Sequence, residues 1–239
     1  MAPDAVRKRY LTEDAKQRAV HEARALKFLE KKFGRITAEG WTYKTARLLR
    51  AEPDREAIVL EYATGTVLAD LPVRSMPDAA FHTGLWVGLY QQRVMNKSDE
   101  GLPYTDCSMY NMSVDFDTRT FTVFDPGKAW GRPGWIYEDL ASFVISILSV
   151  CTRRRLSPFK LLHQFFRGYA SVADNQFRLL QYYRGVMRQI GRKDRAVRDA
   201  RMRWPYRIGT LFMAPVYFIY LPLYLQVKHL AHQLRQGPP

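Results

Sequence analysis

Residues 104–127 read YTDCSMYNMSVDFDTRTFTVFDPG, and this stretch decides the fold that we expect for the chain. Residues 112–115 and 121–124 have the composition of short strands, and the polar Asp-Thr-Arg sequence between them predicts a turn. Residues 101–111 show no clear periodicity, so they are predicted to form a loop before this hairpin. The stretch is thus a loop followed by a β-hairpin, with polar side chains at both ends.

Three of these polar side chains form a pattern that is typical of phosphate chemistry. Asp106 lies in the loop, Asn111 follows it by five positions, and Asp125 comes directly after the second strand. Carboxylate and amide oxygens are hard ligands that suit a divalent cation held together with phosphate. Each residue alone is typical of a turn. Because all three can converge on one point, we expect Asn111 and Asp125 to bind a metal and Asp106 to act as a base or orienting group.

With these motifs the chain resembles the protein-kinase-like phosphotransferase superfamily. The nearest branch is that of the small-molecule and lipopolysaccharide kinases, which include aminoglycoside phosphotransferase, choline kinase and Kdo/heptose kinase. Asp106-x4-Asn111 is similar to the family's catalytic loop, and Phe124-Asp-Pro-Gly127 is similar to its metal-binding Asp-x-Gly turn. The resemblance implies that Asp106 orients an acceptor hydroxyl and that Asn111 and Asp125 bind Mg²⁺. It also implies ATP as the phosphoryl donor.

The resemblance extends outward over roughly residues 6–170. The sequence VLEY at 59–62, followed by Gly65-x-x-Leu68, resembles the hinge strand whose backbone receives adenine, which implies nucleotide-binding roles for Glu61 and Ala63. Lys8 and Glu22 stand where the family has its phosphate-binding Lys and the Glu that pairs with it. The segments YEDLA at 137–141 and FRGY at 166–169 resemble two later family elements, and we expect Asp139 to brace a loop or a helix start.

Hydrophobic periodicity predicts an α+β protein. Helices are expected at residues 12–33, 75–94, 137–151, 157–170 and 177–190, and further strands at 5–10, 42–50 and 57–62. Together with the resemblance, this order predicts a bilobal kinase-like fold with a reduced N-terminal sheet lobe and a larger helical C-terminal lobe. The expected parts are a small lobe at 1–65, a helical lobe at 66–183 and a basic and apolar segment at 184–239.

The last part of the sequence points to an anionic surface. The net charge of the chain is +14, and residues 184–207 contribute +7 of it. Residues 208–227, IGTLFMAPVYFIYLPLYLQV, carry no charge and as a helix would be about 30 Å long, but Pro215 and Pro222 interrupt them. We expect this segment to lie in the membrane interface or to form a shallow hairpin, and the alternative is that it packs in the core of the helical lobe. The expected location is the cytoplasmic face of a membrane, or otherwise the cytoplasm, and the expected acceptor is a lipid-linked sugar or glycolipid.

Several other functions stay open or are disfavoured. No glycine-rich phosphate loop precedes Lys8, which favours a catalytically impaired pseudokinase acting as a membrane-bound binding module, whereas the retained Asp106, Asn111 and Asp125 oppose it. A Ser/Thr protein kinase is a further alternative, although no Ala-Pro-Glu segment follows Asp125. The sequence contains no nucleic-acid-binding motif. Cys107 and Cys151 lack the spacing of a zinc site.

Overall fold

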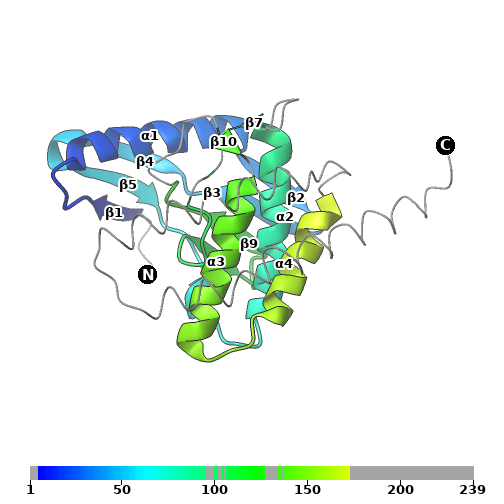
Figure 1. The fold of residues 1–239 in the computed structure, drawn as a ribbon. Coiled ribbons are helices and arrows are strands. Elements are labelled where there is room, and N and C mark those ends of the chain that lie inside the picture. Colours follow the sequence, from blue (N-terminus) through cyan, green and yellow to red (C-terminus); the bar gives the residue numbers. More distant parts are fainter. Residues whose placement is uncertain are drawn as a thin grey trace, which may run out of the picture.

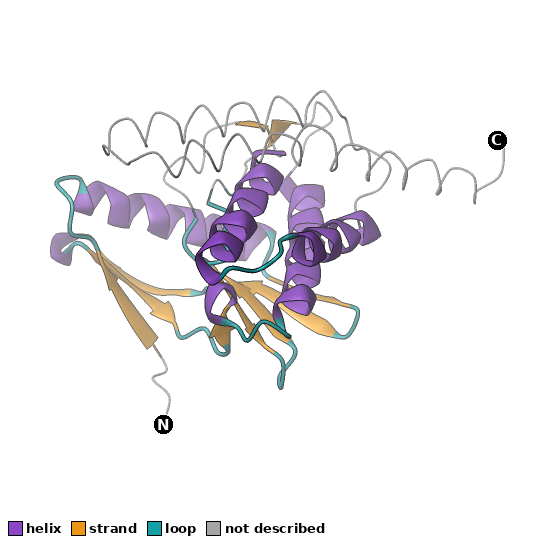
Figure 2. Ribbon diagram, turned by 60° about the horizontal axis from the view of Figure 1, so that its bottom comes forward, coloured by secondary structure: helices purple, strands orange, loops and turns teal. Residues whose placement is uncertain are grey.

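The computed structural model describes residues 5–94, 100–101, 104, 106–126, 134–135 and 137–172. These residues form a mixed α+β protein, which confirms the expected fold class (Figure 1). The helices lie on one side of the strands of the two larger sheets (Figure 2). In chain order the elements are β1 (Ala5–Arg9), α1 (Ala15–Lys32), β2 (Arg35–Ala38), β3 (Trp41–Thr45), β4 (Leu48–Glu52), η1 (Pro53–Arg55), β5 (Ala57–Glu61), β6 (Thr66–Val67), η2 (Leu68–Asp70), α2 (Met76–Val94), β7 (Glu100–Gly101), β8 (Met112–Asp115), β9 (Thr120–Val123), β10 (Gly134–Trp135), α3 (Tyr137–Arg154) and α4 (Phe159–Val172).

The first sheet has three antiparallel strands in the order β1-β5-β4, and α1 packs against it (Figure 1). Small residues on α1 let the helix approach Ile58 and Leu60 of β5 closely; the buried alanines are Ala15, Ala19 and Ala23. The predicted hairpin around residues 52–56 is confirmed as β4 and β5. The single strand predicted at 42–50 is wrong, because this segment is two strands, of which β3 pairs with β9 and β4 pairs with β5.

The second sheet has five strands in the order β2-β3-β9-β8-β6. The predicted hairpin of β8 and β9 is confirmed, and β3 joins it through parallel pairing with β9. Strand β2 was not predicted. It pairs with β3 across Glu39 and Gly40, which both have positive φ angles of 49° and 73°. Such a two-residue turn matches the twist of a hairpin. A strand of the expected N-terminal lobe therefore shares a sheet with the predicted loop-and-hairpin stretch.

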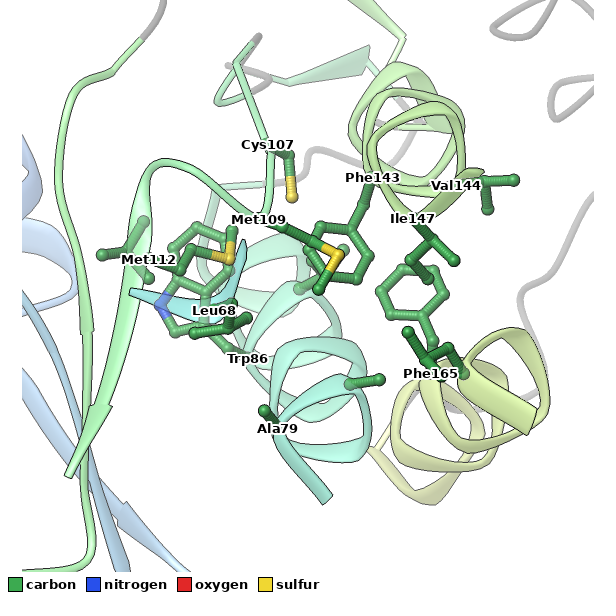
Figure 3. Packing of buried hydrophobic residues seen from close by; sticks show 14 of the residues in the cluster. Leu68, Ala79, Trp86, Cys107, Met109, Met112, Phe143, Val144, Ile147 and Phe165 are labelled. Atoms are coloured by element: carbon green, nitrogen blue, oxygen red, sulfur yellow. The ribbon is translucent and has the colours of Figure 1, made fainter. Parts of the chain in front are cut away.

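The helical part is held together by a close crossing of α2 and α4. A Cβ atom on Gly84 of α2 would lie 1.8 Å from the carbonyl oxygen of Phe165, and one on Gly168 of α4 would lie 1.9 Å from that of Phe81. Only glycine permits this approach of two backbones. The glycine of the FRGY motif thus has a packing role. Around this crossing, Trp86, Phe143, Ile147 and Phe165 form a buried cluster with side chains of the predicted loop (Figure 3).

The four helices that the structure describes occur where the periodicity predicts them, with ends that differ by about one turn or less, whereas the helix predicted at 177–190 lies outside the described residues. The largest differences are three residues each: α1 begins at Ala15 and not at residue 12, and α3 continues past the predicted residue 151 to Arg154. The guanidinium of Arg154 donates to the backbone oxygens of Ala69 and Leu71 at 3.2 and 2.7 Å, which secures the last turn. Gly101, predicted to lie in a loop, belongs to the short strand β7, which pairs with β10.

Among the helices that the structure describes, none combines the length and the apolar character needed to cross a membrane. The basic segment at 184–207 and the apolar segment at 208–227 lie outside the described residues. The membrane expectations, like the division of the chain at residues 65 and 183, therefore stay predictions.

Candidate active site

The first part of the site is an ion pair between β1 and α1. Lys8 donates to both carboxylate oxygens of Glu22, at 3.0 and 2.8 Å, so the predicted pairing of these two residues is confirmed. Lys8 comes from β1, where it lies opposite Ile58 of β5. Burial raises the pKa of the Glu22 carboxyl, and the neighbouring Lys8 ammonium opposes this rise. The pair places a positive charge at a defined point beside the three-stranded sheet.

Tyr10 is a member of the site that the sequence analysis missed. Its hydroxyl donates to Oε2 of Glu22 at 2.5 Å, so Glu22 is held by Lys8 and Tyr10 together. Burial and the Glu22 carboxylate raise the pKa of Tyr10, which keeps its hydroxyl a proton donor. The available signal was the spacing, because side chains two positions apart on a strand lie on the same face.

The second part of the site is the turn after β9. Asp125 forms an ion pair with the Lys8 ammonium, with Oδ1 and Nζ 2.7 Å apart. Lys8 therefore bridges Glu22 of α1 and Asp125 of this turn. Asp125 has a φ angle of 64° in the left-handed region, where Asp and Asn are found more often than other non-glycine residues. A backbone in this region reverses direction sharply. This reversal fits the turn that the family resemblance implies at residues 124–127, although Gly127 lies outside the described residues.

Asn111 joins the predicted loop to the base of the β8–β9 hairpin. Its backbone oxygen accepts from the amide of Phe124 at 3.0 Å, next to Asp125 in the chain. Its side-chain nitrogen donates to the backbone oxygen of Asp106 at 3.1 Å, which holds the loop against the hairpin. The amide oxygen of Asn111 takes no part in this bond and is the atom that a metal would use. The structure thus brings Asp106, Asn111 and Asp125 to the same end of the hairpin.

The loop that carries Asp106 is braced from inside the protein. The buried carboxylate of Asp139 accepts from the backbone amide of Tyr104 at 2.8 Å, so its expected bracing role is confirmed. Ser146, one further residue that the sequence analysis missed, accepts from the amide of Met109 at 2.8 Å. The side chains of Cys107, Met109 and Met112 point into the core (Figure 3). Asp106, in contrast, is exposed. This alternation directs the carboxylate of Asp106 outward from a fixed loop.

Glu61 lies apart from this cluster, at the end of the strand that neighbours Lys8, and Ala63 follows it two positions later, outside the strand. Glu61 is the last residue of β5, three positions after the residue opposite Lys8, which is about 10 Å along the strand. Its carboxylate lies 3.1 Å from the ammonium of Lys44, so the side chain has a structural partner. Gly65 then turns the chain with φ of 88°, and a Cβ there would lie 2.2 Å from the backbone oxygen of Val114. This geometry explains the glycine of the hinge-like motif.

A cleft of about 830 Å³ opens beside Glu22, Asp106 and Asp125. It is large enough for a nucleotide-sized ligand. It is lined by residues of α1, of the loop and of the turn, among them Arg18, Glu22, Arg24, Asp106, Asp125 and Pro126. Among the described residues, no three His, Cys, Asp or Glu side chains are grouped to hold a metal ion. A cation at Asn111 and Asp125 would therefore take further oxygen ligands from phosphate or water.

Comparison with known proteins gives a likeness in fold. No protein-family description matches the sequence, and no curated protein sequence matches it. The chain is similar to two solved structures of aminoglycoside phosphotransferase APH(3'')-Id from Streptomyces rimosus ATCC10970, the first in complex with ADP and streptomycin. The TM-scores are 0.48 and 0.46 at 11% identity, over 77% of this chain and 85% and 84% of the other chains. The chemistry of this site is accordingly inferred from its own side chains.

Proposed function

We propose that this chain is a kinase-like phosphotransferase, which uses ATP and Mg²⁺ to phosphorylate a hydroxyl group. The observation that carries the proposal is the position of Lys8, whose ammonium bridges the buried Glu22 and the turn carboxylate of Asp125. A cation fixed beside a metal-binding carboxylate is what positioning of a phosphoryl group requires. The solved structures with a similar fold are phosphotransferases, and one of them is an ADP complex.

The donor set fits Mg²⁺ and phosphate. Asn111 and Asp125 would hold the metal through hard oxygen atoms, and we expect these atoms to lie within about 6 Å of each other, since one Mg²⁺ binds its ligands near 2.1 Å. Lys8 would exchange its contact with Asp125 for phosphate oxygens while Glu22 and Tyr10 keep the ammonium in place. When bound, Mg²⁺·ATP supplies the phosphoryl group and the metal neutralises its charge. The backbone at Glu61 and Ala63 would receive the adenine.

Asp106 would orient the acceptor hydroxyl and accept its proton. Its carboxylate is exposed on the cleft, and its loop is held by Asp139, Ser146 and Asn111. A base must be held within hydrogen-bond reach of the hydroxyl that it serves, and a braced loop meets this need. The acceptor class that we favour is a lipid-linked sugar or glycolipid at the cytoplasmic face of a membrane. The support is the net charge of +14 and the uncharged segment at 208–227.

Nucleotide titration tests the proposal. Isothermal titration of the purified chain with ADP should show binding that is strengthened by Mg²⁺. Asp125→Asn should abolish the Mg²⁺ effect, because the amide lacks the charge that attracts the metal. Asp117→Asn is the matched control, since Asp117 is an exposed carboxylate in the turn at the far end of the same hairpin. Absence of ADP binding by the wild-type chain would contradict the proposal.

A second candidate is a pseudokinase that binds a nucleotide without transferring phosphate. The direct contact of Lys8 with Asp125 favours it, because in this arrangement the phosphate-binding cation and the metal-binding anion satisfy each other. In the same titration, this candidate predicts ADP binding that Mg²⁺ does not change. Strengthening by Mg²⁺ would instead favour the enzyme.

A further inference from the structure

Arg18 occupies a defined position beside the ion-pair cluster. It lies one helical turn before Glu22 on α1, and residues four apart on a helix lie on the same face. Its guanidinium lies over the ring of Tyr10, 5.3 Å from the centroid, which is within the range of a cation–π contact. The hydroxyl of the same Tyr10 donates to Glu22. Arg18 is half-buried, and its guanidinium is held on the ring of Tyr10, which itself belongs to the site.

Among the residues that the structure describes, the charge of Arg18 is not matched by a carboxylate. Lys16, which also lines the cleft, forms an ion pair with Asp54 at 2.7 Å. Within residues 5–94 and the other described segments, no carboxylate forms such a pair with Arg18. A partly desolvated guanidinium is stabilised by an anion that accepts from it, and its planar fork suits phosphate oxygens. The cleft therefore offers a cation that an anionic ligand could satisfy.

We infer that Arg18, which lines the cleft, binds the same polyphosphate group as Lys8, since both cations lie over the ring of Tyr10, each 5.3 Å from its centroid. The inference deepens the proposed function and rests on it for the identity of the ligand as a nucleotide. Asp106 and Asp125 line the same cleft as Arg18. A ligand that carries both phosphate and a divalent cation can therefore place its anionic part at Lys8 and Arg18 and its cation at the carboxylates.

The test measures binding to the full chain with two probes, Mg²⁺·AMP-PNP and Mg²⁺·tripolyphosphate, and with adenosine as the uncharged reference. Arg18→Gln should weaken both phosphate probes by about tenfold or more, the loss typical of a charge-assisted hydrogen bond, and leave adenosine unchanged. Arg18→Lys should lose less, because it keeps the charge but not the fork. Lys27→Gln is the matched control. Lys27 is exposed on the same helix and does not line the cleft, so this substitution removes the same charge at a distance from the cleft.

Each outcome decides the inference. Equal affinities of Arg18→Gln and Lys27→Gln for the phosphate probes would overturn it while leaving the proposed function intact. If the wild-type chain binds tripolyphosphate but neither AMP-PNP nor adenosine, the nucleotide proposal fails, and a loss in Arg18→Gln would still support a phosphate site. If the wild-type chain binds neither phosphate probe, both fail. Should Arg18→Gln unfold, its melting curve will reveal this and Arg18→Lys decides: affinity equal to that of wild type overturns the inference, and reduced affinity supports it.

Discussion

The ammonium of Lys8 lies 2.7 Å from the carboxylate of Asp125, and this contact joins the two larger sheets at the candidate site. Lys8 belongs to β1 of the three-stranded sheet, whereas Asp125 follows β9 of the five-stranded sheet. The side chains are 28% and 38% exposed, and ion pairs that solvent reaches to this degree contribute only about 0–1 kcal/mol. The contact is therefore weak enough to be exchanged for a phosphate group, while the buried Glu22 keeps Lys8 in position.

Asp106→Asn should lower phosphoryl transfer while leaving the nucleotide site intact. Removal of a base and orienting group typically costs about 10²-fold or more in turnover. The exposed position of Asp106 predicts an unchanged melting curve and unchanged ADP affinity. The measurement is ATP turnover with titration of ADP, and Asp117→Asn is the control. Turnover at the wild-type rate in a folded Asp106→Asn variant would refute the catalytic role.

Glu22 should make stability depend on pH in a defined direction. Burial raises the pKa of its carboxyl above the ordinary value of 4.5, so between the unfolded and folded pKa values the folded state binds more protons than the unfolded state. The contribution of Glu22 to the free energy of unfolding therefore falls as pH rises from about 4.5 through its folded pKa. Urea unfolding of the wild type and Glu22→Gln measures this. As pH rises through that window, the free energy of unfolding of the wild type should fall relative to that of Glu22→Gln. A difference between the two that is constant with pH would contradict the prediction.

His82 should make the protein less stable as pH falls, which is the opposite direction to the effect of Glu22. Its Nδ1 lies 2.7 Å from the hydroxyl of Tyr43 and its ring packs on Trp41, and burial lowers the pKa of His82 from 6.5 to about 4. The unfolded state then binds more protons between these values, so stability is lost as pH falls from 6.5 toward 4. The loss is on the order of 3 kcal/mol for a shift of this size. In His82→Asn, urea midpoints between pH 4 and 7 should vary less than in the wild type, and equal slopes would show that His82 stays uncoupled from folding.

Gly84→Ala should destabilise the protein strongly. The new Cβ would lie 1.8 Å from the backbone oxygen of Phe165, so α2 and α4 would have to move apart. Overpacking of this kind costs about 1–3 kcal/mol, and backbone on both sides leaves little room for relief. Gly168→Ala should act similarly, since it meets Phe81 across the same crossing. Thermal unfolding is the measurement, and a melting temperature within a degree or so of wild type would show that the helices can separate without cost.

The segment at 208–227 should bind membranes by burying apolar side chains, with the basic segment at 184–207 facing anionic headgroups. Both lie outside the described residues, so the expectation comes from the sequence alone. Flotation with anionic vesicles should weaken with salt, because charges are screened over about 10 Å at 0.1 M, but should not disappear. Deletion of residues 208–239 should abolish flotation. A full-length chain that stays monomeric without detergent and ignores vesicles would place the segment in the core instead.

Much of the site could be predicted because its signals are local in the chain. The five-residue spacing of Asp106 and Asn111, and the hairpin that separates Asn111 from Asp125, define a short loop and a tight turn whose geometry follows from a few residues. The helices were predicted for the same reason, since an apolar repeat reports the buried face of each helix. The division of residues 42–50 into β3 and β4 could not be predicted, because each half pairs with a different distant strand.

The sequence by itself determined the α+β class, the helix positions, the β8–β9 hairpin and the order of the acidic and amide residues. The tertiary structure alone showed that Tyr10 joins Lys8 in holding Glu22, that Lys8 reaches Asp125, and that Asp139 binds the amide of Tyr104. Local patterns depend on neighbouring backbone dihedrals and the periodicity of burial, which a short window of sequence contains. Contacts between remote residues depend on which strands pair and how closely helices cross, and these follow from the packing of the whole chain.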